Sequence, residues 1–273
     1  MTDRYVVFGN PVAHSLSPDL HNYFAKNYAQ DLIYDRVLIP EGCFESIAKE
    51  QFNSGLKGCN ITVPCKLDAY KFADTLSPYA KACGAVNTLK LQSDGQIFGD
   101  NTDGRGLCDD FDRIGIDLFD KRILIIGAGG AARGIILPIY ERHPKSITVV
   151  NRNKDRALEL KKIFDYLEVK EFSELTAEYD LIINATSASL NGLLPPLPDE
   201  VLKNSLAVYD LMYKKDGQTV FTLKAQSLGV KHCFDGLGML LGQAALSFDL
   251  WRGIKPDLQK TYLYFAKRLG RNA

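Results

Sequence analysis

The sequence has no excess of either charge, no long apolar run and no signal-peptide pattern. Its 273 residues carry 33 Lys and Arg against 33 Asp and Glu, so no overall field favours nucleic acid or an anionic membrane. No apolar stretch approaches the roughly 18 residues of a spanning helix, and the N-terminus lacks a basic region followed by an apolar one. We therefore expect a cytoplasmic protein, a monomer or homodimer, whose partner is a small molecule.

Cysteine pairs at metal-binding or redox spacing are also missing. The six cysteines are scattered without a C-x-x-C motif or histidines at ligand spacing, which argues against a zinc site and against a disulfide framework. We expect reduced thiols, mostly buried, and no metal. Cys65 directly precedes Lys66, a candidate site residue considered below. We interpret Cys65 as a small packing residue in preference to a reactive thiol.

The composition is that of an ordinary globular protein, with 46% hydrophobic and 24% charged residues and a mean hydropathy of −0.12. Strand-like and helix-like segments alternate, which predicts an α/β fold. The length suits two domains. We predict an α/β domain over residues 1–103, completed by C-terminal helices at 238–273, and a second α/β domain over residues 104–237, with a cleft between them.

Predicted strands of the first domain cover residues 5–9, 35–39, 58–63, 87–91 and 96–99, and predicted helices cover 18–29, 41–52 and 66–73. In the second domain, strands are predicted at 123–126, 146–150, 180–184, 206–210 and 230–233. Helices are predicted from residue 104 and at 131–140, 158–166, 219–228, 237–251 and 258–269. The pair Ser17-Pro18 predicts a helix start with Ser17 as N-cap.

A glycine turn follows the apolar run 123–126. Gly127, Gly129 and Ala132 have the spacing G-x-G-x-x-G/A between a buried strand and a helix start. This motif predicts that residues 104–237 form a Rossmann-like dinucleotide-binding domain. Glycines allow close approach of a pyrophosphate, and the unpaired amides of the helix supply positive potential. Taken alone, the motif is also compatible with a turn that merely packs a helix on a strand.

The next strand, 146–150, ends where an adenosine ribose would bind. An NAD enzyme usually carries Asp or Glu there, whereas this chain has Asn151 and Arg152, followed by Arg156. Positive charge at this tip suits a 2′-phosphate and favours NADP as the cofactor. The competing interpretation is a solvated basic turn.

Seven polar clusters lie near the ends of predicted elements, at residues 14–18, 58–66, 84–88, 99–103, 184–187, 209–213 and 235–243. In this order, together with the glycine turn, they resemble the shikimate dehydrogenase family, the NADP-dependent reductases of 3-dehydroshikimate in aromatic amino-acid and chorismate biosynthesis. The resemblance extends from about Tyr5 to Pro256. It implies two α/β domains with the substrate pocket between them.

The resemblance also implies roles for individual residues. Lys66 and Asp103 would be the catalytic pair that assists proton transfer to the ketone oxygen; on position alone, Lys66 would be an exposed residue of a first helical turn. The substrate carboxylate would be bound by Ser15, Ser17 and Tyr213. The ring hydroxyls would be bound by Asn60, Thr62, Asn87, Asp103 and Gln243.

For the cofactor, the resemblance assigns the pyrophosphate to Gly127, Gly129, Gly130 and Ala131, and the adenosine ribose and 2′-phosphate to Asn151, Arg152 and Arg156. It places Thr186, Ser187, Leu211 and Gly236 beside the nicotinamide half. Leu211 and Asn153 depart from the Met and Thr that many members carry. Two alternatives stay open: an NAD-preferring quinate/shikimate dehydrogenase, and a non-catalytic sensor of shikimate-like ligands.

Overall fold

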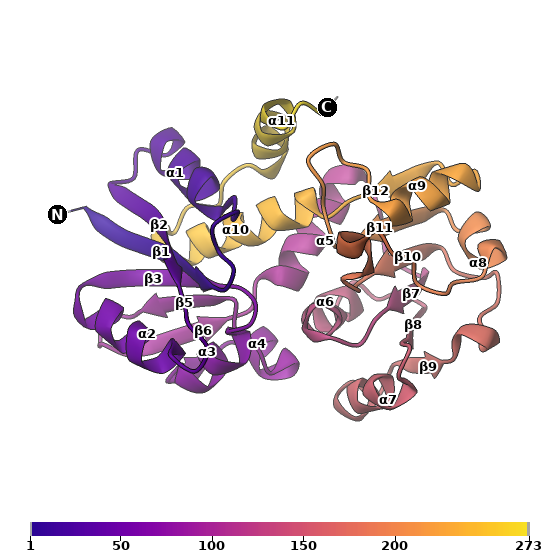
Figure 1. Cartoon of the computed structure of the whole chain (residues 1–273), viewed down its shortest axis with the longest axis horizontal. Helices are drawn as coiled ribbons and strands as arrows, with labels where there is room; N and C mark the ends of the chain where they lie inside the picture. Colours follow the sequence, from indigo (N-terminus) through magenta and orange to yellow (C-terminus); the bar gives the residue numbers. More distant parts are fainter. Residues whose placement is uncertain (1, 272–273) are drawn as a thin grey trace. The chain divides into compact units, whose positions relative to one another are not determined.

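The structure is a computed structural model that describes residues 2–271 and divides into two compact units (Figure 1). The first unit comprises the chain up to Gly106 together with Leu241–Asp257, and the second comprises Leu107–Leu240 and the chain from Leu258 onward. Each unit contains one β-sheet with helices packed on it, which confirms the predicted α/β fold class. No helix among the described residues is long and apolar enough to cross a bilayer.

The sheet of the first unit is mixed. Its strands are β1 (Asp3–Gly9), β2 (Leu32–Leu38), β3 (Leu56–Ile61), β4 (Thr75–Leu76), β5 (Thr88–Leu91) and β6 (Ile97–Asp100). They lie in the order β2-β1-β3-β5-β6-β4. The first three run parallel, β5 is antiparallel to both of its neighbours, and β4 is parallel to β6. The five residues from Tyr5 to Gly9 are all buried, as expected for a central strand.

Helices α1 (Ser17–Asn27), α2 (Phe44–Asn53), α3 (Lys66–Phe72) and α4 (Pro78–Cys83) complete this part of the first unit. One hydrophobic core joins the strands to α2, α3 and α4 through Phe44, Ala69 and Ala80. Cys65 belongs to this core with 2% of its surface exposed, and burial raises the pKa of its thiol. Its interpretation as a packing residue is therefore confirmed.

The sheet of the second unit is parallel throughout. Its strands are β7 (Arg122–Ile126), β8 (Ser146–Val150), β9 (Glu168–Lys170), β10 (Leu181–Asn184), β11 (Ala207–Asp210) and β12 (His232–Phe234). The strand order is β12-β11-β10-β7-β8-β9. After β9, at one edge of the sheet, the chain returns to the middle of the sheet, where β10 pairs with β7. The topological switch point therefore lies beside the end of β7, where doubly wound sheets bind ligands.

Helices of the second unit are α6 (Gly130–Tyr140), α7 (Lys154–Ile163), α8 (Asp199–Lys203), α9 (Val220–Ser227) and α11 (Leu258–Arg268). Short 3₁₀ turns cover Phe172–Glu174 and Ala188–Asn191. A core cluster joins β7, β8, β10 and β11 to α8 and α9, with Ile182, Val208 and Phe221 at 0% exposure. The sheet is thus buried by helices, as its uninterrupted apolar strands predict.

The division between the units differs from the predicted one at the C-terminus. We predicted that residues 238–273 complete the first domain, but only Leu241–Asp257 belong to the first unit. Helix α11 belongs to the second unit, where the Arg113 guanidinium stacks 3.6 Å from the ring centre of Tyr262. Periodicity alone identifies α11 as a helix but does not say which sheet it accompanies.

Two further helices, α5 (Asp103–Ile114) and α10 (Leu237–Arg252), each run from one unit into the other. Within the first unit their backbones touch: a Cβ added to Gly106 would lie 2.3 Å from the nitrogen of Gln243, and one on Gly242 would lie 2.4 Å from the carbonyl oxygen of Gly106. Glycine at both positions lets the helices pack at backbone distance, which brings the start of α5 against α10.

Gly242→Ala is expected to destabilise the protein by about 3 kcal/mol, because the added methyl group overlaps the Gly106 carbonyl and the helices must separate. Urea denaturation monitored by circular dichroism would measure the change. At an unconstrained helical position the same substitution stabilises by about 0.5–1 kcal/mol. The sign of the effect is therefore diagnostic, and a stabilised variant would contradict the close crossing.

Candidate active site

The predicted carboxylate-binding serines lie at the start of α1. The Oγ of Ser15 accepts the backbone N–H of Ser17 at 3.2 Å, which leaves the Ser15 hydroxyl proton for another acceptor. The Arg36 guanidinium donates to the carbonyl of Ser15 at 2.7 Å and holds this loop. Leu16 occupies the N-cap position and no side chain caps the helix, so the prediction of Ser17 as N-cap is wrong.

Lys66 and Asp103 form an ion pair, with 2.5 Å between Lys66 Nζ and Asp103 Oδ2. Each is the first residue of its helix, Lys66 of α3 and Asp103 of α5. Their side chains are 28% and 13% exposed, so the pair is partly buried but can be reached by a ligand. A lysine oriented by a carboxylate can deliver a proton to a developing alkoxide or remove one from an alcohol.

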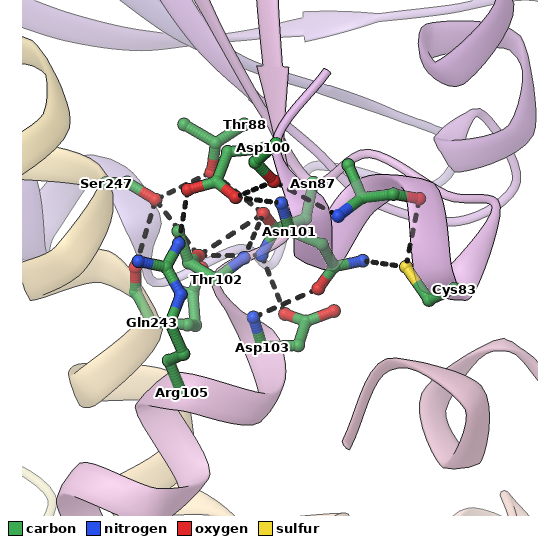
Figure 2. A network of polar contacts seen from close by, with 12 residues as sticks. Cys83, Asn87, Thr88, Asp100, Asn101, Thr102, Asp103, Arg105, Gln243 and Ser247 are labelled. Carbon is green, nitrogen blue, oxygen red and sulfur yellow. Dashed lines mark hydrogen bonds and ion pairs between the residues drawn. The ribbon is translucent and has the colours of Figure 1, made fainter. Parts of the chain in front are cut away.

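Asn87 holds the carboxylate of Asp103 in place (Figure 2). Its Nδ2 donates to Asp103 Oδ1 at 2.8 Å, while its Oδ1 accepts the backbone N–H of Thr102 at 2.9 Å. The Asp103 backbone N–H also donates to Asn101 Oδ1 at 3.2 Å. One carboxylate oxygen is therefore bound by Asn87 and the other by Lys66, which fixes the plane of the carboxylate.

Asp100 anchors the turn that leads to Asp103 (Figure 2). Its Oδ1 accepts the Ser77 hydroxyl at 2.5 Å and the backbone N–H of Asn101 at 2.8 Å. Its Oδ2 pairs with the Arg105 guanidinium. Because Asp100 is only 4% exposed, these bonds compensate the loss of water around a buried carboxylate.

Asn60 lies inside the protein with 5% of its surface exposed. Its Nδ2 donates to the hydroxyls of Thr88 and Ser247 at 3.1 and 2.9 Å, and its Oδ1 accepts the Tyr34 hydroxyl at 2.8 Å. Asn87 is 2% exposed and similarly bonded. Asn60 Oδ1 accepts one of the two bonds that an amide oxygen can accept. Asn87 Oδ1 already accepts from both Thr88 and Thr102, so contact of Asn87 Oδ1 with a ring hydroxyl would require one of these bonds to be exchanged.

The other two predicted substrate residues of the first unit, Thr62 and Gln243, are partly exposed. Thr62 follows β3, and its backbone N–H donates to the Phe8 carbonyl at 2.9 Å. Gln243 lies on α10, and its carbonyl accepts the Ser247 hydroxyl at 2.9 Å. Ser247 also lies 3.3 Å from the Thr102 hydroxyl, so α10 is tied to the turn before Asp103.

In the second unit, the glycine turn follows β7 as predicted. Gly127 has φ +114°, and a Cβ there would lie 3.1 Å from Thr186 and 3.2 Å from the Ala185 carbonyl, so glycine is required. Gly129 is the N-cap of α6 and provides no side-chain cap. A Cβ on Gly129 or Gly130 would meet no atom within 4 Å. The uncapped first turn of α6, from Gly130 through Ala131, therefore offers backbone N–H groups in open space, which suits a pyrophosphate.

The tip of β8 carries the predicted 2′-phosphate residues. Arg152 and Arg156 are exposed and make no ion pair with any described residue, whereas Lys154 pairs with Glu171 at 2.9 Å. Asn151 Nδ2 donates to the Asn153 carbonyl at 2.7 Å. Two guanidinium groups without carboxylate partners at this tip can bind a phosphate dianion.

Asn153 starts helix α7, because its side chain accepts the backbone N–H of Asp155 at 2.9 Å. The helix consequently begins at Lys154 and not at residue 158 as predicted.

The ends of β10 and β11 are joined by a buried polar group that the sequence interpretation did not assign. Asn184 Nδ2 donates to Asp210 Oδ1 at 3.2 Å, and the Ser189 hydroxyl donates to Asp210 Oδ2 at 2.5 Å. Burial raises the pKa of Asp210, partly offset by these donors. Thr186 donates its hydroxyl to Asn184 Oδ1 at 2.7 Å and so is oriented by the same group. The signal for this buried polar group in the sequence was a polar residue at the last position of each apolar strand, Asn184 in β10 and Asp210 in β11.

The remaining cofactor residues lie in neighbouring turns. Ser187 is the N-cap of the 3₁₀ turn Ala188–Asn191. Leu211 is 6% exposed and its backbone N–H donates to the Asn184 carbonyl at 2.9 Å. A Cβ on Gly236 would lie 2.1 Å from the Leu211 carbonyl oxygen, so only glycine fits there. Tyr213 is also in this unit, and burial raises the pKa of its hydroxyl.

The predicted residues thus fall into two sets, one per unit. The first unit holds Lys66 and Asp103 with the serines, Thr62, Gln243 and the two asparagines, and the second holds the glycine turn, the β8 tip and Tyr213. Neither set includes a metal-binding cluster: the described residues contain no group of three or more His, Cys, Asp or Glu that could hold an ion.

Three family patterns match the chain in succession. They are described as shikimate dehydrogenase substrate binding domain over residues 7–89, shikimate/quinate 5-dehydrogenase over 111–204, and shikimate 5′-dehydrogenase C-terminal domain over 236–262. A curated shikimate dehydrogenase (NADP(+)) from Vibrio campbellii is 47% identical, over 98% of this chain and 97% of the relative.

Solved structures are similar over nearly the whole chain. An Ael1 enzyme from Pseudomonas putida has a TM-score of 0.92 at 38% identity, covering 97% of this chain and 98% of that one. A shikimate 5-dehydrogenase from Thermus thermophilus, in complex with NADP(H) and shikimate, has a TM-score of 0.88 at 34% identity, covering 98% and 100%. With matching patterns across both units and this level of identity, the chain belongs to the shikimate dehydrogenase family.

Proposed function

We propose that this protein is an NADP-dependent oxidoreductase that interconverts 3-dehydroshikimate and shikimate, a step of chorismate and aromatic amino-acid biosynthesis. The observation that carries the proposal is the partly buried Lys66–Asp103 ion pair in a chain of this family. The curated relatives carry the same activity in their names.

The chemistry requires a hydride and a proton. NADPH, held by the second unit, would supply the hydride that the carbonyl carbon C3 requires. Lys66 Nζ donates a proton to the carbonyl oxygen as negative charge develops there, and in the reverse direction it accepts the hydroxyl proton. Asp103 keeps the Nζ in place through the 2.5 Å contact and stabilises its positive charge. Asn87 in turn orients Asp103.

Substrate binding is proposed to place the C3 oxygen beside Lys66. The hydroxyls of Ser15 and Ser17 would donate to the carboxylate, with Tyr213 as a third donor. Thr62, Gln243 and the Asp103 carboxylate would bind ring hydroxyls, which both donate and accept hydrogen bonds. Asn60 and Asn87 would also contact ring hydroxyls. Both amides are in addition bonded within the protein, and Asn87 orients Asp103.

The second unit is proposed to hold NADP. The open first turn of α6 fits a pyrophosphate, Asn151 would contact the adenosine ribose, and Arg152 and Arg156 would bind its 2′-phosphate. The nicotinamide half would lie near Thr186, Ser187 and Leu211, with the Gly236 backbone bonded to the carboxamide.

The double substitution Arg152→Ala and Arg156→Ala is expected to weaken NADP binding by about a hundredfold, roughly tenfold for each charge-assisted contact removed. NAD has no 2′-phosphate, so its affinity should hardly change. Isothermal titration calorimetry with both cofactors would measure the difference. Lys154→Ala is a matched control from the same turn, because Lys154 is paired with Glu171. Equal losses for NADP and NAD would contradict the 2′-phosphate assignment.

We also propose that the enzyme works in the cytoplasm as a monomer or homodimer with a small-molecule substrate. The six cysteines, all of them among the described residues, form no disulfide and four are buried, which suits a reducing compartment. Light scattering of the purified protein would determine its oligomeric state.

The reaction itself can be tested by product analysis. Incubation of 3-dehydroshikimate with NADPH deuterated at C4 should give shikimate with one deuterium at C3. Unlabelled shikimate from NADPH deuterated on either face, or no product, would contradict direct hydride transfer.

A further inference from the structure

Arg271 lies near the C-terminus, beyond the end of α11, yet its side chain is only 6% exposed. Its two terminal nitrogens donate to the two carboxylate oxygens of Asp235, at 2.9 and 2.7 Å. Its Nε donates to the Lys215 carbonyl at 3.1 Å, and Nη2 also donates to the Lys214 carbonyl. The guanidinium therefore holds this segment through a forked set of charge-assisted hydrogen bonds.

Asp235 is the centre of this arrangement. Its side chain is 4% exposed and accepts the backbone N–H of Lys214 at 3.2 Å and of Leu237 at 3.4 Å, in addition to the guanidinium. The Arg271–Asp235 pair therefore joins three segments of the second unit: the C-terminal chain, the loop after β11 at residues 211–217, and the turn at residues 235–237.

Two of these segments carry residues of the proposed site. The loop contains Tyr213, and the turn contains Gly236, whose backbone N–H donates to the Met212 carbonyl at 3.0 Å. The charges of Arg271 and Asp235 also act on Tyr213: burial is the largest influence and raises the pKa of its hydroxyl, Arg271 lowers it, and Asp235 raises it. Lys214, which directly follows Tyr213, contacts both members of the pair through its backbone N–H and carbonyl.

An arginine suits this task because its planar fork can bind a carboxylate with two bonds while its remaining donors reach carbonyl oxygens. A lysine would supply the charge but not the fork. Asp235 would then keep a cation nearby, whereas the carbonyls of Lys214 and Lys215 would lose a donor held in fixed geometry.

We propose that Arg271 is a positioning residue for the site: it fixes the loop with Tyr213 against the turn with Gly236. The effect on catalysis rests on the proposed function, because it requires Tyr213 to bind the substrate carboxylate. The fixing of the loop against the turn does not rest on the proposed function, so the effect on structure and the effect on catalysis can be measured separately.

The first measurement is hydrogen exchange of the full-length protein, followed by mass spectrometry. Arg271→Met should accelerate exchange in peptides covering residues 212–217 and 235–239, while peptides from β7 and β8 stay as protected as in the wild type. Lys267 is an exposed residue of the preceding helix α11, so Lys267→Met is the charge-matched control and should leave exchange in both segments unchanged. Unchanged protection of both segments, or a uniform rise across the second unit, would overturn the proposal.

The second measurement is steady-state kinetics with shikimate and NADP. Arg271→Met should raise KM for shikimate about tenfold, the scale of one lost hydrogen bond to a charged group, and lower kcat by a smaller factor. Arg271→Lys, which keeps the charge, should retain the melting temperature and yet show an intermediate KM. A wild-type KM in Arg271→Met, despite the faster exchange, would overturn the link to substrate binding. An inactive wild-type protein would instead refute the proposed function and leave the exchange result standing.

Discussion

Lys66→Ala is expected to lower kcat for shikimate oxidation by about 10²–10⁴-fold, with a much smaller change in KM. The reason is that Lys66 Nζ is proposed to transfer the proton in the transition state, whereas most of the proposed binding contacts come from other residues. In the structure the Nζ is held by Asp103 Oδ2 at 2.5 Å and remains partly exposed, which is the geometry that proton transfer to a bound ligand needs.

Lys71→Ala is the matched control for this experiment, because Lys71 is an exposed lysine on the same helix. It should retain wild-type kcat and KM. Steady-state assays of both variants, with circular dichroism to confirm folding, would separate the loss of Nζ from a general effect on α3. If Lys66→Ala turned over at the wild-type rate, Lys66 would have no part in the mechanism.

Asp103→Asn is expected to lower kcat by at least about 10²-fold. The substitution keeps the shape of the side chain but removes the negative charge beside Lys66. If the amide oxygen keeps the bond from Asn87, its NH₂ group faces Lys66 Nζ, and two donors then oppose each other where a donor and an acceptor met at 2.5 Å. Lys66 should lose its fixed position as well as its counter-charge.

Because Asp103 is also proposed to bind a ring hydroxyl, its substitution should raise KM for shikimate, unlike that of Lys66. Asp112→Asn serves as the control, since Asp112 is an exposed carboxylate on the same helix, paired with Arg142 at 2.7 Å. Rate measurements over a range of pH would complete the test. An Asp103→Asn variant with normal kcat would show that Lys66 needs no carboxylate partner.

The sequence predicted the alternation of strands and helices in both units, because this alternation depends on local patterns, whereas the roles of Lys66 and Asp103 are predictions that rest on the family resemblance. Apolar runs ending in glycine or in polar clusters mark the ends of strands, and Lys66, Asp103 and Gly127 all follow such ends. The sequence did not predict which hydrogen bonds hold these residues in place. The bonds of Asn87 to Asp103 and of Ser247 to Asn60 join positions far apart in the chain, and no local pattern reports them.

Two serine-proline pairs illustrate the same limit. Ser77-Pro78 starts α4, and the Ser77 side chain accepts the Ala80 backbone N–H at 3.1 Å, as an N-cap should. Ser17-Pro18 looks identical in sequence, but there Leu16 precedes the helix and Ser17 lies inside it. The loop of Ser15 is held by Arg36, a residue on a different element, so tertiary contacts decide where this helix begins.

The alternatives raised by the sequence now differ in support. A sensor without activity would have no need for a lysine held at 2.5 Å from a carboxylate that is itself fixed by Asn87. An NAD-preferring quinate/shikimate enzyme would have no use for the two unpaired guanidinium groups at the tip of β8. Discrimination against quinate depends on one ring hydroxyl, which a pocket distinguishes at a scale of about 1–3 kcal/mol.

The most direct test of the account is a comparison of kcat/KM for shikimate and quinate, each with NADP and with NAD, from the absorbance of the reduced nicotinamide. We predict that shikimate with NADP is the best pair, at least about tenfold better than shikimate with NAD. Preference for NAD would contradict the role of Arg152 and Arg156. Absence of turnover with every pair, in a protein that still binds shikimate, would contradict the catalytic role of Lys66 and Asp103.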